Sequence, residues 1–274
     1  MNRPPLRYFG GKWRLAPWII SNMPVHRKYV EPFGGGAAVL MQKPRVYAEV
    51  YNDIDNEVVN VFRVMRNEKA ARRLTSLLEL TPFAESEYAT VSVDHPDASP
   101  AERARRTIAR TFMSHRAGTN PKWPAFRHVC AANKPTATEW SEYPQHIKQF
   151  CQRLQGVVIT SRGALEIISR HDSADALMYI DPPYPLSDRK DPSHGYKHEM
   201  NDDDHTELAQ LLHDVQAMVM VSGYPGMYEE LYEDWTCISQ KSRTSATSVN
   251  GEYGREMLWM SPNAVRQPNL WEDE

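Results

Sequence analysis

The chain has 274 residues, 41% of them hydrophobic, which is enough for one large α/β domain with an inserted subdomain. Its formal net charge of −3 excludes a protein that binds nucleic acid through overall basicity alone. No stretch approaches the roughly 18 apolar residues of a membrane helix, so we expect no membrane partner. The three cysteines (Cys130, Cys151 and Cys237) are widely spaced and form no CxxC pair. This pattern argues against a disulfide scaffold and against a metal site, and it predicts a cytoplasmic protein.

Two glycine-containing segments near the N-terminus are candidate ligand sites. Residues 8–12 read YFGGK and are followed by apolar residues at helical spacing, which predicts a turn that opens a helix. Alone, such a turn is more often structural than a ligand site. A short strand at 28–33 then runs into GGG at 34–36, the pattern of the first βα unit of a nucleotide-binding fold. It is neither a Walker A loop nor a GxGxxG motif.

A second strand is predicted at 46–51 and ends at the sequence NDID, residues 52–55. An acid after the second strand of such a fold is placed to bind ribose hydroxyls, which makes Asp53 a candidate ligand. The alternative is that Asp53 or Asp55 only caps the following helix. Both roles are met if Asp53 binds the ligand and Asp55 caps the helix.

Residues 67–153 interrupt the alternation of strands and helices and are predicted to be a mostly helical insertion. Its segment 114–128 mixes aromatic residues with the candidate DNA-binding residues Arg116, Asn120, Lys122 and Arg127. These residue types contact phosphates and base edges. Basic faces are usually only solvated, but an insertion between two halves of a sheet lies over its ligand-binding edge.

The second half of the sheet is predicted at 156–160, 176–180 and 218–221, with an antiparallel pair at 236–239 and 256–260. The apolar run 176–180 predicts a strand buried on both faces, and the sequence DPPY at 181–184 ends it. Asp181 therefore lies at the carboxyl end of a central strand. The Asp181 carboxylate, the Pro182 carbonyl and the Tyr184 ring suit a flat ring that carries an exocyclic amine.

The four segments YFGGK, EPFGGG, NDID and DPPY occur in this order and together resemble the D12 class of DNA adenine-N6 methyltransferases. The resemblance covers nearly the whole chain and implies an α/β fold with a Rossmann-like class I methyltransferase sheet. Residues 1–66 and 154–274 would form the two parts of a catalytic domain that binds S-adenosyl-L-methionine. Residues 67–153 would be the target-recognition domain that binds double-stranded DNA.

The resemblance also implies roles for single residues. Tyr8 and Lys12 would line the pocket for cofactor and target base, Phe33 and the Gly35 turn would pass under the methionine part, and Asp53 would hold the ribose. Asp181 would lie where cofactor and base meet. The cofactor-binding residues so assigned are Tyr8, Lys12, Phe33, Gly35, Asp53 and Asp181. The sequence departs from the family at Ala37, which ends the glycine turn, and at Arg162-Gly163, where an acid often stands near the cofactor adenine.

The expected reaction is methyl transfer to N6 of an adenine flipped out of the duplex, with Asp181, Pro182 and Tyr184 as catalytic residues. Asp181 and the Pro182 carbonyl would accept the two amine N–H groups, and Tyr184 would stack on the base. N4 of cytosine is the nearest rival target because it is also an exocyclic amine. Two rival functions stay open, a non-catalytic DNA-binding protein and a nicotinamide-dependent oxidoreductase. A restriction endonuclease acting on the same site is a further candidate partner.

Overall fold

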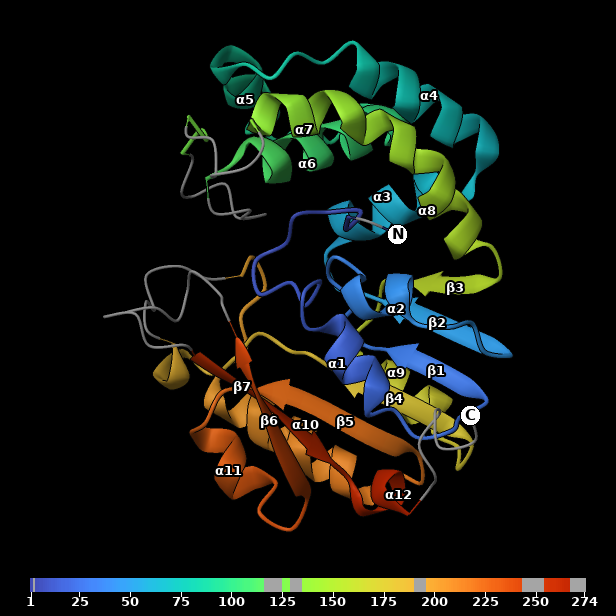
Figure 1. Ribbon diagram of the computed structural model, residues 1–274, viewed down its shortest axis with the longest axis vertical. Helices are drawn as coiled ribbons and strands as arrows, with labels where there is room; N and C mark the ends of the chain where they lie inside the picture. Colours follow the sequence, from blue (N-terminus) through green and yellow to red (C-terminus); the bar gives the residue numbers. More distant parts are fainter. Residues whose placement is uncertain (2, 116–124, 129–134, 190–195, 243–253, 267–274) are drawn as a thin grey trace.

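The computed structural model describes residues 1, 3–115, 125–128, 135–189, 196–242 and 254–266 (Figure 1). A seven-stranded sheet with the order β3-β2-β1-β4-β5-β7-β6 forms its centre. Strands β1 to β5 run parallel, and β7 is antiparallel to both of its neighbours. This order confirms the predicted Rossmann-like class I methyltransferase sheet. The strands are β1 (Lys28–Glu31), β2 (Ala48–Asn52), β3 (Val157–Thr160), β4 (Ala176–Ile180), β5 (Met218–Gly223), β6 (Thr236–Ser242) and β7 (Gly254–Met260).

The central strand β4 is buried along its whole length, as its apolar sequence predicts. Its side chains alternate between two cores, because successive residues of a strand point to opposite faces. Leu177 packs with α1 (Ala16–Ser21), α2 (Ala38–Gln42) and α3 (Asn56–Arg66). Met178 packs on the other face, which α9 (Ala164–His171), α10 (Asp202–Asp214) and α11 (Met227–Leu231) cover. The short helix α12 (Pro262–Val265) follows β7.

The insertion is helical in its described residues, in agreement with the sequence prediction. Figure 1 shows its helices gathered at one end of the molecule, beyond α3 and the β3 edge of the sheet. They are α4 (Glu68–Glu79), α5 (Glu85–Val91), α6 (Pro100–Met113), α7 (Thr136–Glu142), the 3-10 helix Tyr143–His146 and α8 (Ile147–Leu154). Their apolar residues join the same hydrophobic core as α1, α2 and α3. The division at residues 66 and 153 stays a prediction, because the core is continuous across these boundaries.

Within the described residues no helix has both the length and the apolar character that crossing a membrane requires. Cys151 and Cys237 are both free thiols.

Candidate active site

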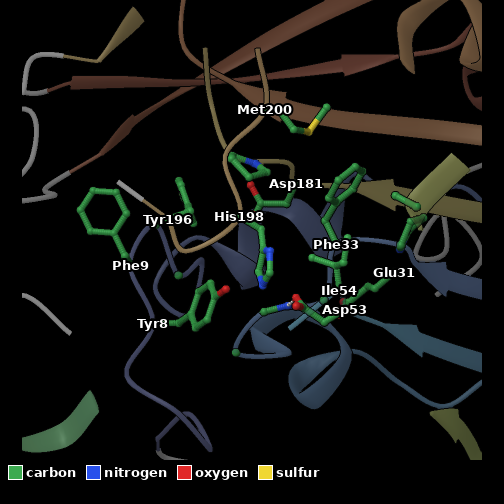
Figure 2. A pocket seen from close by; sticks show the side chains of 18 of the residues that line it. Tyr8, Phe9, Glu31, Phe33, Asp53, Ile54, Asp181, Tyr196, His198 and Met200 are labelled. Atoms are coloured by element: carbon green, nitrogen blue, oxygen red, sulfur yellow. Dashed lines mark hydrogen bonds between the residues drawn. The ribbon is translucent and has the colours of Figure 1, made fainter. Parts of the chain in front are cut away.

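A cavity lies at the carboxyl ends of the parallel strands, where β1, β2 and β4 end. All four sequence motifs contribute to its wall, and Figure 2 shows their side chains converging on it. Tyr8 and Phe9 come from the N-terminal loop, Phe33 from the turn after β1 and Asp181 from the end of β4. Ligands of open α/β sheets bind at this edge. The structure therefore brings together the predicted residues Tyr8, Lys12, Phe33, Gly35, Asp53 and Asp181.

Lys12 and Asp181 form an ion pair at one end of the cavity. Lys12 Nζ lies 2.9 Å from Asp181 Oδ1, and the Lys12 side chain is 4% exposed against 20% for Asp181. Burial lowers the pKa of Lys12, but the carboxylates of Asp181 and Glu256 outweigh burial and hold that pKa well above its usual value. Lys12 is therefore an ammonium. The helix expected to start beside it begins only at Ala16, so Lys12 acts through its side chain rather than at a helix terminus.

Asp53 fixes the glycine turn after β1. Its Oδ2 accepts a hydrogen bond from Gly35 N and its Oδ1 accepts one from Asp55 N, both at 2.8 Å. Burial raises the pKa of Asp53 to about 6. Gly35 has a φ of +46°, and a Cβ there would lie 2.9 Å from the Tyr8 ring. Only glycine fits this turn, which passes directly beneath Tyr8.

Asp55 caps α3, as the sequence suggested. Its side chain accepts from Glu57 N at 2.9 Å, and Lys197 Nζ lies 3.0 Å from its Oδ1. The two acids after β2 thus have different surroundings. Asp53 lines the cavity, whereas Asp55 stabilises a helix start.

Glu31 also lines the cavity, and the sequence motifs assigned it no role of its own. Its Oε1 accepts hydrogen bonds from the Tyr29 hydroxyl and from Leu40 N, both at 2.7 Å. Burial raises the pKa of Glu31 to about 7. Glu31 is an acid at the carboxyl end of a buried strand, and the same sequence pattern identified Asp181.

The family pattern described as D12 class N6 adenine-specific DNA methyltransferase matches residues 8–246. The chain belongs to this family. The type II methyltransferase M.MjaIII of Methanocaldococcus jannaschii is 26% identical over 76% of this chain and 78% of its own length. The DNA adenine methylase of Vibrio cholerae is 24% identical over 66% of this chain and 65% of its own length. A solved structure, the rRNA methyltransferase aviRa of Streptomyces viridochromogenes, is 12% identical at a TM-score of 0.36, covering 92% of this chain and 86% of its own.

In this D12-class methyltransferase, Tyr184 lies behind Asp181 rather than in the cavity wall. Its side chain is 4% exposed, its hydroxyl donates to Glu256, and its ring centroid lies 4.8 Å from that of Tyr224. Pro182 is buried as well, and of the two prolines in the DPPY sequence it is Pro183 that lines the cavity. Stacking of Tyr184 on a base stays a prediction, and it requires the ring to become accessible.

Tyr196 is an aromatic residue of the cavity that the sequence motifs did not include. Its ring centroid lies 5.2 Å from that of Phe9 and 6.5 Å from that of Tyr8. Gly10 has a φ of +71°, and a Cβ there would overlap the Tyr196 hydroxyl. Tyr196 therefore packs directly on the glycine turn of the YFGGK segment (Figure 2). No local pattern in the sequence predicts this contact between residues so far apart.

Three of the four predicted DNA-binding residues, Arg116, Asn120 and Lys122, lie outside the described residues. Arg127 is half-buried, and its backbone N–H donates to Met113 O at 2.8 Å. A bridge between Ser114 and Phe126 also joins the two chain segments that flank residues 116–124.

Arg162 lines the cavity at the position where the family often has an acid. Its backbone N–H donates to Asn52 Oδ1 at 2.9 Å, and its guanidinium pairs with Glu166 at 2.7 Å. The departure from the family pattern therefore lies in the cavity wall itself, next to the end of β2.

Proposed function

We propose that this DNA adenine methyltransferase takes its methyl group from S-adenosyl-L-methionine and transfers it to N6 of an adenine flipped out of duplex DNA. The observation that carries the proposal is the position of Asp181, whose carboxylate faces the same cavity as the glycine turn. Both contacts of Asp181 with described residues use Oδ1: the ion pair with Lys12, and a 3.3 Å hydrogen bond from Ser222 Oγ. In this proposal the other oxygen, Oδ2, accepts from the incoming amine.

The side chains of the cavity fit the proposed cofactor. Glu31 offers a buried carboxylate to an ammonium group, and Asp53 offers one to ribose hydroxyls. Tyr8 packs on the Gly35 turn, where a Cβ would lie 2.9 Å from its ring, so glycine leaves the backbone of this turn in the cavity wall for a close approach by the cofactor. Tyr8, Lys12 and Phe33 complete the proposed cofactor wall.

When bound, the cofactor supplies an electrophilic methyl group, and the protein contributes positioning and charge. The amine lone pair of adenine is conjugated with the ring and is therefore a poor nucleophile. Asp181 Oδ2 and the Pro182 carbonyl accept the two N–H groups, which localises the lone pair on the nitrogen. The nitrogen loses one proton on methylation, and Asp181 is the carboxylate placed to accept it. Tyr184 stacks on the base in this proposal once its ring is accessible.

The test is methyl transfer from labelled S-adenosyl-L-methionine to unmethylated genomic DNA, followed by nucleoside analysis and methylation-aware sequencing. N6-methyladenine within one short sequence is the expected result. N4-methylcytosine would keep the two-acceptor chemistry but contradict the choice of base. Binding of cofactor and of duplex without incorporation would instead support a non-catalytic DNA-binding protein.

Cofactor affinity is expected to fall as the pH drops through 7. Burial raises the pKa of Glu31 to about 7 and that of Asp53 to about 6, so both carboxylates gain protons in this window. An ammonium ligand binds the ionised form of Glu31, so affinity at pH 6 should be roughly tenfold weaker than at pH 7.5. Calorimetry with S-adenosyl-L-homocysteine measures it. The Glu31→Gln variant should bind S-adenosyl-L-homocysteine weakly, and its affinity should not change near pH 7. A wild-type affinity that is independent of pH would refute the assignment of Glu31.

The candidate DNA-binding segment, residues 114–128, gives a second prediction. Replacing Arg116 or Lys122 by alanine should weaken duplex binding several-fold and leave cofactor affinity unchanged. The slope of the logarithm of duplex affinity against the logarithm of salt concentration should become shallower by about one. Lys28→Ala is the matched control. Lys28 lies at the amino end of β1, away from the cavity, and its Nζ donates to His171 O and Ser173 Oγ. Fluorescence anisotropy of a labelled duplex at several salt concentrations measures the effect. Equal loss of both ligands would remove the case for residues 67–153 as the recognition domain.

The proposed partners are double-stranded DNA and a restriction endonuclease that cuts the same site, and the proposed location is the cytoplasm. The type II name of the archaeal relative supports the endonuclease. Protection of the methylated sequence against that endonuclease would test the partnership.

A further inference from the structure

Glu256 lies at the back of the active site, although no motif of the sequence pointed to it. It belongs to β7, and its side chain is 2% exposed. Its carboxylate accepts a hydrogen bond from the Tyr184 hydroxyl and lies 3.5 Å from Lys12 Nζ. Burial raises the pKa of Glu256, while Lys12 and Tyr184 oppose this shift by donating to the carboxylate. A buried carboxylate requires such donors, and here both of them also flank Asp181.

Glu256 completes the set of acceptors around the Lys12 ammonium. An ammonium has three N–H donors, and Lys12 Nζ has three acceptors within reach. They are Gly10 O at 2.7 Å, Asp181 Oδ1 at 2.9 Å and Glu256 Oε1 at 3.5 Å. One ammonium thus serves two carboxyl groups, whose negative charges exceed its single positive charge when both are ionised.

We propose that Glu256 is a positioning residue for methyl transfer. By sharing the Lys12 ammonium, it lets Lys12 hold Oδ1 of Asp181 without neutralising the Asp181 carboxylate, whose Oδ2 then accepts from the target amine. This inference rests on the proposed function. Positive charge grows on the amine nitrogen during transfer, and a fixed negative cluster stabilises it. Without the Glu256 charge, the Lys12 ammonium is paired with Asp181 alone.

Glu256→Gln tests the inference because glutamine keeps the size and one acceptor oxygen but removes the charge. Single-turnover methylation should fall by about tenfold or more, while the dissociation constant for S-adenosyl-L-homocysteine changes by less than about threefold. Leu258→Ala is the matched stability control. Leu258 is fully buried on the same strand and outside the cavity, so this variant should melt at a lower temperature without slowing the folded enzyme.

A double-mutant cycle separates action through Lys12 from a general structural effect. Lys12→Met should be slow, and adding Glu256→Gln to it should cause no further loss. Where Glu256→Gln alone fails to fold, the double variant still tests the inference, because any further loss in the Lys12→Met background contradicts action through Lys12.

A wild-type rate for Glu256→Gln, or an equal further loss in the Lys12→Met background, would overturn the inference while leaving the proposed function intact. Absence of any methylation by the wild-type protein would overturn both. A slow Glu256→Gln variant with normal cofactor affinity and no additivity would support it.

Discussion

The Asp181→Ala variant is expected to lose methyl transfer by about 1,000-fold or more while folding and binding cofactor nearly as the wild type does. The loss arises because the substitution removes the acceptor Oδ2 at the reacting amine. The fold should tolerate it because β4 is buried through residues 176–180, whereas Asp181 itself is 20% exposed. Lys12 keeps Gly10 O and Glu256 as acceptors, so no buried ammonium is left unpaired.

Single-turnover assays with labelled cofactor measure the loss of methyl transfer. Thermal unfolding measures whether the variant folds. Asp175→Ala is the matched control, since Asp175 is an exposed aspartate at the other end of β4 and accepts from Ser173 Oγ at 2.7 Å. It should methylate DNA at the wild-type rate. A near-normal rate for Asp181→Ala would disprove the proposed two-acceptor mechanism, and a failure to fold would disprove the claim that Asp181 is dispensable for structure.

The sequence predicted the sheet well because its signals are local. The apolar run before Asp181 predicts a strand buried on both faces, which the structure confirms, and the two prolines after it end the pairing. The glycine turn at Gly35 and the acid Asp53 follow from the same βα geometry, and their 2.8 Å contact joins them. Residues placed by the ends of parallel strands were therefore found correctly as neighbours in one cavity.

The parts of the site that the sequence did not predict depend on contacts between distant segments. Glu256 reaches Lys12 because β7 inserts antiparallel beside β5, a pairing whose register no local pattern fixes. Tyr196 packs on Gly10 because the chain that follows β4 passes back over the cavity to the N-terminal loop. The DPPY sequence predicts that Tyr184 faces a base, yet its hydroxyl donates to Glu256 and its ring is buried. Motif order identifies residues, but only the tertiary packing sets which way they point.

A second buried cluster joins the insertion to the sheet and gives the largest expected effect on stability. Arg153 of α8 forms two hydrogen bonds to Glu49 of β2, at 2.6 and 2.9 Å, and Lys43 Nζ lies 3.0 Å from the same carboxylate. The side chains of Glu49 and Arg153 are 3% and 8% exposed. Removing the shared anion leaves two buried cations facing each other, which costs far more than losing a surface pair.

Glu49→Gln is therefore expected to lower the free energy of unfolding by about 4 kcal/mol and the melting temperature by roughly 10 °C. Glu68→Gln is the control, because it breaks the exposed Arg72–Glu68 pair and removes an exposed charge from the first turn of α4, which together should cost about 1 kcal/mol or less. Calorimetry also tests the domain boundaries. The core that runs from the sheet into the insertion predicts one cooperative transition that moves as a whole. Two transitions, with only one displaced by Glu49→Gln, would instead mean that residues 67–153 unfold as a separate unit.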